Sequence, residues 1–200
     1  IEKMHENKIN EDFYIPTFLN SPTKIIIGTA IVYFIFSQLS QLFCHVTDIH
    51  LPPFFPAIGF ATAMVFIFGR KALIGVAIGS LLFSINLYKT DFQDATTYGE
   101  LLKLLQLLLV RPLIACLNAF FVTYLIKLWC KNNYPFTKGT HVLYFAAASI
   151  LGCTIGVSII MILFLNTSIF SIEQVLLLWN NRIRGNSLGI ILFTPFVLSC

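Results

Sequence analysis

Long apolar stretches alternate with short polar stretches along the chain, and this alternation predicts helices that cross a membrane. A helix needs about 20 apolar residues to cross roughly 30 Å of hydrocarbon. Six stretches approach or exceed that length, at about residues 24–46, 54–69, 72–88, 101–129, 140–165 and 179–198. The pattern therefore predicts an all-α fold, a polytopic membrane bundle of about six transmembrane helices.

The polar segments between these stretches predict how the helices are connected. Residues 1–22 have mixed charge and predict a cytoplasmic lead, so that the membrane domain covers residues 23–200. Gly69 and the two basic residues after it predict a helix stop. Residues 89–100 are acidic and polar and predict an external loop. Residues 166–184 predict a second external segment, with a short helix along the membrane surface followed by a turn of the type Gly-Asn-Ser-Leu-Gly.

The basic residues predict the orientation of the bundle. Loops on the cytoplasmic side of a membrane protein carry an excess of Lys and Arg. With the N-terminus inside, the inner segments hold Lys3, Lys8, Lys24, Arg70, Lys71, Lys127, Lys131 and Lys138. The outer segments hold Lys89, Lys103, Arg182 and Arg184. We therefore expect both chain ends in the cytosol.

Composition excludes a water-soluble domain. Hydrophobic residues make up 57% of the 200 residues and charged residues 11%, against about 25% charged in soluble domains. Twenty Phe residues in a chain so poor in charge exceed what one soluble core can bury. The net charge of +4 comes from loop residues, which the orientation rule explains, so nothing indicates a nucleic-acid partner.

One charged residue interrupts an apolar stretch. Arg111 lies well inside 101–129, directly before Pro112. An intramembrane Arg is costly unless it is paired or hydrated, which makes it a functional candidate. Its partner is left open among carbonyls freed by Pro112, water, a bound anion and a carboxylate from outside the chain; a tilted helix that brings Arg111 to the interface is the structural alternative. The full set of ligand-binding or switch candidates is Arg111, Asn86, Asn118, Trp179, Arg182 and Asn186.

Small residues recur at spacings that favour close helix packing. Gly75 and Gly79, and again Gly152 and Gly156, have the GxxxG spacing that brings two helix backbones together. The helix-packing candidates are Gly59, Gly75, Gly79, Gly152, Gly156, Gly189, Pro56 and Pro195.

The sequence gives no metal site and no catalytic centre. The five cysteines are scattered singly, without the paired spacing of a zinc site. His45, Asp48 and His50 lie in one loop, where an exposed polar loop is the simpler interpretation. No His, Asp or Glu cluster within the apolar stretches offers general acid–base chemistry. We expect no cofactor, no metal and no enzymatic activity.

Two motifs stand out in the chain, a Pro-Ala-x-Gly…Gly-Arg element and a closing Trp…Gly-x-x-Leu-Gly…Pro element. Their residues are Pro56, Gly59, Ala61, Gly69, Arg70, Trp179, Gly185, Leu188, Gly189, Leu192 and Pro195. In kind and in order these motifs resemble those of the MASE1 family, the membrane-associated sensor domains found ahead of bacterial signalling enzymes. Asn186 replaces the family's usual Asp, Phe55 its Trp, and Ala57 its second Pro.

The resemblance implies a multi-pass sensory domain in the bacterial inner membrane, coupled to a histidine kinase or a cyclic-di-GMP enzyme. No catalytic domain of either type is present in these residues, so we expect one to follow Cys200 or to be a separate partner protein. The expected partners are the lipid bilayer, an unidentified small ligand, a second copy of the chain and the cytoplasmic signalling domain. The alternative function is a small transport subunit that captures substrate for an importer.

Overall fold

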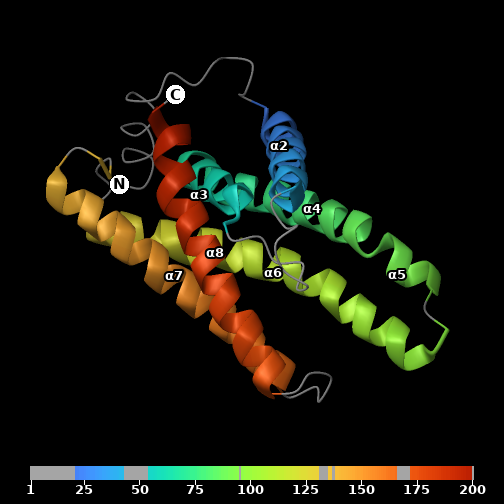
Figure 1. Ribbon diagram of the computed structural model, residues 1–200. Helices are drawn as coiled ribbons and strands as arrows, with labels where there is room; N and C mark the ends of the chain where they lie inside the picture. The colour runs from blue at the N-terminus through green and yellow to red at the C-terminus, as the bar shows by residue number, and fades with distance from the viewer. Residues whose placement is uncertain are drawn as a thin grey trace.

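The computed structural model describes residues 21–42, 54–94, 96–130, 135–136, 138–165 and 172–199, and the regular structure in these ranges is helical throughout. The helices pack around one another as a bundle (Figure 1). They are α2 (Pro22–Leu42), α3 (Pro56–Phe68), α4 (Arg70–Leu87), α5 (Lys89–Asp94), α6 (Tyr98–Trp129), α7 (Gly139–Leu165) and α8 (Ile172–Ser199). The predicted all-α membrane bundle is confirmed.

Four of these helices, α2, α4, α6 and α7, are long and apolar enough to cross a membrane. Their outer faces carry exposed large apolar side chains such as Ile31, Ile78, Leu113 and Ile155. A soluble protein avoids such broad apolar surfaces, whereas a bilayer covers them. Helices α3 and α8 are not among these four, since α3 has only 13 residues and α8 has a polar first half.

Close contacts show the relative directions of the helices. Gly75 of α4 lies against Ile26, and Gly79 lies against Ala30, so α2 and α4 run parallel with α3 between them in the chain. Contacts of the same kind make α6 antiparallel to α4, and α7 antiparallel to α6. The end of α8 accordingly points toward the end of the bundle where α2 begins (Figure 1). These directions place the start of α2 and the end of α8 at the same end of the bundle.

Helix α3 is enclosed by the others. It contacts α2, α4, α6 and α8, and residues 56–63 are all buried. Pro56 occupies the first turn, where its missing N–H costs nothing. Gly69 ends α3 with φ +63°, a left-handed conformation that glycine adopts without strain. The predicted helix stop at Gly69 is therefore confirmed, and α4 begins at the next residue.

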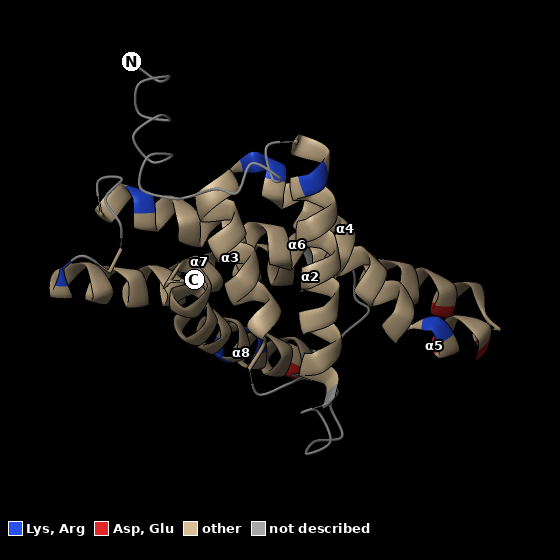
Figure 2. Cartoon of the chain, turned by 90° about the horizontal axis from the view of Figure 1, so that it is seen from above, with Lys and Arg blue, Asp and Glu red and all other residues tan. Residues whose placement is uncertain are grey.

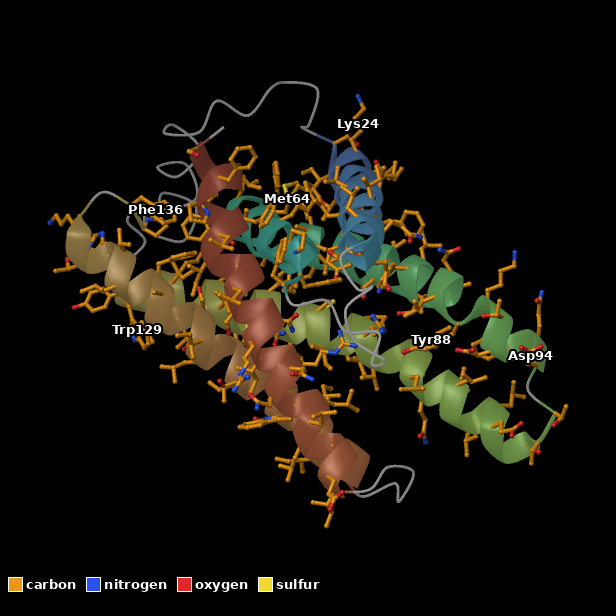
Figure 3. All side chains as sticks on the ribbon, viewed as in Figure 1. Lys24, Met64, Tyr88, Asp94, Trp129 and Phe136 are labelled. Atoms are coloured by element: carbon orange, nitrogen blue, oxygen red, sulfur yellow. The ribbon has the colours of Figure 1, made fainter. Side chains whose placement is uncertain are left out.

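Two predicted loops are helical instead. Residues 89–94 form α5, and α6 begins at Tyr98, where Thr97 and Glu100 make a capping box that satisfies the first backbone N–H groups. Figure 3 shows Asp94 at the far tip of this extension, beyond Tyr88. The predicted turn at residues 185–189 and the separate surface helix before it are also wrong, because α8 runs unbroken from Ile172 to Ser199.

The reason for the unbroken α8 lies in its neighbour. The Gly185 carbonyl accepts a hydrogen bond of 3.1 Å from the Phe55 N–H, and Gly189 lies against the Phe55 carbonyl. Glycine is tolerated within a membrane helix when an adjacent helix fills the space left by the missing side chain. The same two glycines that suggested a turn are thus the contact surface for α3. The lead at residues 1–20 and the loop containing His45, Asp48 and His50 lie outside the described residues.

Candidate ligand-binding site

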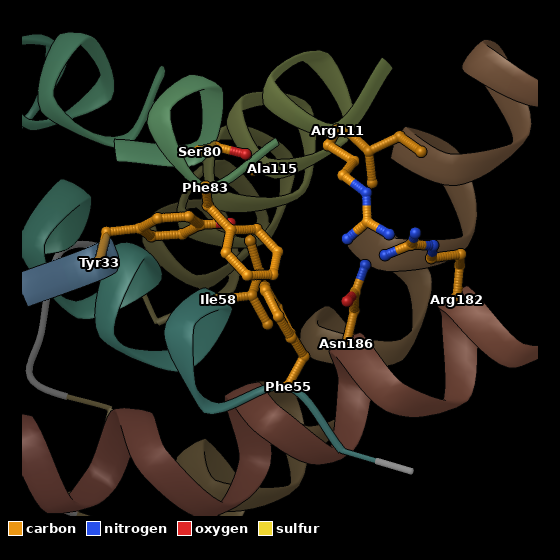
Figure 4. Close-up of a pocket in the computed structure, with 10 residues that line it drawn as sticks. Tyr33, Phe55, Ile58, Ser80, Phe83, Arg111, Ala115, Arg182 and Asn186 are labelled. Carbon is orange, nitrogen blue, oxygen red and sulfur yellow. The ribbon is translucent and has the colours of Figure 1, made fainter. Parts of the chain in front are cut away.

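A small cavity lies among α2, α4, α6 and α8, at the N-terminal end of α3. The volume in it that is open to the centre of a water molecule is about 20 Å³, which is room for roughly one water molecule. Its lining combines aromatic, apolar and basic side chains (Figure 4). The lining residues are Tyr33, Phe55, Ile58, Ser80, Phe83, Arg111, Ile114, Ala115, Arg182 and Asn186.

Arg111 enters this cavity from α6 and is only 9% exposed. Its Nε donates a hydrogen bond of 3.3 Å to the Tyr88 hydroxyl at the end of α4. Its guanidinium carbon lies 5.5 Å from the ring centroids of both Phe83 and Tyr88. Cation–π contacts of this kind favour a guanidinium that has lost most of its water. Arg111 therefore faces the interior of the bundle, held by the last turns of α4.

Helix α8 supplies the other two polar groups on this side of the cavity. Arg182 and Asn186 are four residues apart, so an unbroken helix places them on one face. Figure 4 shows both side chains directed toward the Arg111 guanidinium. Asn186 is 5% exposed and Arg182 is half-buried. The helical form of residues 185–189 is thus what brings Asn186 to the same side as Arg182.

The opposite wall comes from α2 and α4. Tyr33 is 1% exposed, and its hydroxyl is hydrogen-bonded to the side chain of Ser80. Both arginines of the cavity are close enough to interact electrostatically with this hydroxyl. Tyr33 and Ser80 were not among the sequence candidates. The available signal was a phenol in the middle of an apolar stretch, because a buried Tyr hydroxyl needs a partner.

The described carboxylates lie elsewhere. Asp91, Asp94, Glu100 and Glu173 are all exposed, and none of them lines the cavity. Figure 2 shows acidic residues at α5 and near the start of α8, away from the centre of the bundle. Among the described residues, the formal charges that line the cavity are therefore both positive.

The other three switch candidates lie outside the cavity. Asn86 is exposed on α4. Asn118 is fully buried between α6 and α7, where its amide contacts the backbone position of Gly156 and neither amide atom has a hydrogen-bond partner. Trp179 donates a hydrogen bond of 2.9 Å from Nε1 to the Ser158 hydroxyl and links α8 to α7. The structure thus brings together Arg111, Arg182 and Asn186 and separates the rest.

The six glycine packing candidates all lie at contacts between helices, and Pro56 is buried in the first turn of α3. A methyl group added at any of the six glycines would meet a neighbouring helix at a distance shorter than real Cβ contacts. Pro195 lies inside α8, and the adjacent Thr194 hydroxyl donates a 2.9 Å hydrogen bond to the Gly59 carbonyl of α3. These contacts hold α8 against α3 on the C-terminal side of Asn186.

Trp179→Phe is expected to lower the free energy of unfolding by about 0.6 kcal/mol, the average for an interhelical hydrogen bond in a bundle. The ring is retained, so the loss reports the bond to Ser158. Unfolding in mixed micelles should show the same loss for Ser158→Ala and no further loss in the double variant. Trp129→Phe, at a ring contact with Tyr144, is the matched control. Additive losses from Trp179→Phe and Ser158→Ala would contradict the coupling.

No three His, Cys, Asp or Glu side chains gather around a common point in the described part of the chain. Cys116, Cys130 and Cys153 are free thiols there, and each occupies a separate position among the helices. The cavity chemistry is therefore that of guanidinium, amide and hydroxyl groups.

The chain was compared with known families, curated proteins and solved structures. The profile of the MASE1 family matches residues 23–200, which is nearly the whole chain. No curated protein and no solved structure matches it.

Proposed function

Since the chain belongs to the MASE1 family, the membrane sensor domains of bacterial signalling proteins, we propose that it is the input domain of a histidine kinase or a cyclic-di-GMP enzyme in the inner membrane. A ligand in the cavity favours one packing of the helices over another, and α8 carries that difference to the cytosol. A ligand shifts such an equilibrium only by its difference in affinity for the two packings.

The observation that supports this proposal is the position of α8. One unbroken helix carries Arg182 and Asn186 at the cavity, contacts α3 at Gly189, and continues to Ser199. Its 28 residues span about 42 Å. A change at the cavity therefore reaches the end of the bundle through one rigid element, without crossing a loop.

The distribution of basic residues supports a cytosolic position for that end. Lys127 lies 5.4 Å from the centroid of the Phe66 ring, so the last turns of α6 and α3 are adjacent. Arg70 and Lys71 follow directly at the start of α4, which lies beside the start of α2 and its Lys24 because Gly75 is packed against Ile26. The acidic residues at α5 lie at the opposite end of α4 (Figure 2). This is the asymmetry that the positive-inside rule describes.

The cavity favours a sensor over a transport subunit. Tyr33, Ile58 and Phe83 close its inner side, and each is 1% exposed. A solute bound beside Arg111 would meet packed aromatic and aliphatic side chains on that side. Binding without passage is the behaviour required of an input domain.

The proposal predicts that output depends on the rotational phase of α8. In a fusion of the whole chain to a diguanylate cyclase domain, one alanine inserted after Ser199 turns the output domain by about 100°. We expect cyclic-di-GMP in cells to change severalfold with this insertion. A seven-residue helical insertion, close to two full turns, should restore the original level.

The insertion point lies beyond the packed part of the bundle, so folding should be unaffected, and detergent-solubilised yield provides the control. Equal output from both insertions and from the parent fusion would mean that the chain is a passive anchor. Uptake of a solute by cells that express the chain would instead support the transport function.

A further inference from the structure

We infer that the contact between α6 and α7 at Asn118 has a second packing, in which the Asn118 amide is hydrogen-bonded, and that this contact is a moving part of the switch. The inference rests on the proposed function and deepens it by naming the interface that changes. The starting observation is a buried amide without a partner. Asn118 is 0% exposed, and neither its Oδ1 nor its Nδ2 has a hydrogen-bond partner among the described residues.

An unpaired amide is a more serious feature than an unpaired hydroxyl. A hydroxyl can turn to the carbonyl four residues earlier in its own helix, as the hydroxyls of Ser84 and Ser149 do. The amide of Asn118 carries both donors and an acceptor, and all of them are unpaired. Burial of such a group costs free energy, and the membrane interior supplies no water to satisfy it. The observed packing therefore carries a cost that an apolar side chain of the same shape would avoid.

The glycines of α7 explain how a second packing can form. The Asn118 Oδ1 lies directly against Gly156, where an added methyl group would overlap it, and Val122 lies against Gly152 in the same way. At a glycine no side chain covers the helix backbone, and each carbonyl keeps a lone pair beyond its helical bond. Helices in switching proteins shift by about 1–2 Å. A shift that moves Oδ1 off Gly156 lets the amide N–H face a carbonyl of α7.

This contact lies between the cavity and α8. Asn118 follows Arg111 by seven residues on α6, which is close to two turns, so both lie on the same side of one helix. On α7, Ser158 is two residues after Gly156 and accepts the hydrogen bond from Trp179 of α8. A change at Arg111 that turns α6 therefore reaches α7 at Asn118, and α7 passes it to α8 at Trp179.

The first test measures thermal unfolding of the purified whole chain in maltoside micelles. Asn118→Leu keeps the branched shape and removes the unpaired amide, so we expect the Tm to rise by about 4 °C. Thr194→Val is the matched control, because it removes a buried hydroxyl that has a partner, and it should lower the Tm. Asn118→Val is smaller and guards against a leucine too large for the contact. If neither Asn118 variant raises the Tm, the amide is satisfied in the native chain and the inference is wrong.

The second test uses the fusion to a diguanylate cyclase domain. Asn118→Leu favours the observed packing, whereas Gly156→Ala opposes it, because the added methyl group overlaps the Asn118 Oδ1. We expect the two variants to change cyclic-di-GMP severalfold in opposite directions. Asn118→Ala combined with Gly156→Ala removes the overlap and should move output back toward the parent level. A Gly156→Ala chain that does not assemble, judged by detergent-solubilised yield, would mean that the contact has one packing only and would overturn the inference.

The outcomes separate this inference from the proposed function. The Tm measurement needs no output domain. If the alanine insertion after Ser199 changes output but Asn118→Leu and Gly156→Ala do not, the contact at Asn118 is no part of the switch, and the inference fails while the proposed function stands. If the insertion has no effect either, the proposed function fails and the inference fails with it.

Discussion

Replacement of Gly189 by alanine is expected to lower the free energy of unfolding by about 1–3 kcal/mol, the usual cost of overpacking a filled interior. The added methyl group would meet the Phe55 carbonyl oxygen, and the Phe55 carbonyl carbon would be 2.7 Å away. These are backbone atoms at the start of α3, so no side-chain rotation relieves the contact. Helices α3 and α8 must separate, and Gly189→Leu should prevent assembly altogether.

Gly28→Ala is the matched control for this result. Gly28 is also a helical glycine, but a methyl group there meets nothing within 4 Å. Helix propensity alone makes that change neutral or favourable by up to about 1 kcal/mol. Thermal unfolding and size-exclusion profiles in detergent compare the two variants. A Gly189→Ala chain as stable as Gly28→Ala would contradict the close approach of α3 and α8.

Charge reversal at the cavity is expected to have the largest effect on signalling. Arg111→Glu places a carboxylate on α6 opposite Arg182 of α8 (Figure 4). Opposite charges in a poorly hydrated site attract strongly, so α6 and α8 are held together. In the cyclase fusion, cyclic-di-GMP in cells should therefore be held at one extreme and differ severalfold from the level of the parent chain.

Arg111→Met is the companion variant and should give the opposite state. It removes the donor fork and the cation–π contacts with Phe83 and Tyr88 but supplies no carboxylate. We expect output to change in the opposite direction from the parent level. If the Glu and Met variants give the same output, Arg111 affects folding rather than switching.

The helical class and the presence of several membrane-spanning helices could be predicted from the sequence because each apolar stretch indicates its own environment. The continuity of α8 could not. Gly185, Asn186 and Gly189 favour a turn when they are considered alone, and only the backbone of α3 at Phe55 explains why they remain helical. Residues 89–94 were misjudged for a related reason, since their polarity indicates exposure but not the absence of helix.

The polar residues show the same division. Arg111 was conspicuous because a charge within an apolar stretch is rare, and Arg182 because it enters the last one. Their convergence was not visible in the sequence, since it depends on the packing of α6 against α4 and of α8 against α3 and α7. Tyr33 and Ser80 carry no charge and resemble ordinary interior residues in the sequence. Only the folded structure shows that both line the cavity. Asn118, like Asn186, is an amide within an apolar stretch, but it lies between α6 and α7 and not at the cavity.

The shortness of α3 has a consequence for biogenesis. Thirteen helical residues extend about 20 Å, too little to span the hydrocarbon unaided. During synthesis this segment can pack against α4, which follows it directly. The Gly59 carbonyl, however, can accept its hydrogen bond from the Thr194 hydroxyl only after another 135 residues have been added. The contact between α3 and α8 therefore forms only after α8 has been synthesised, and the helix that we propose as the signal transmitter is also the one that completes the surroundings of α3.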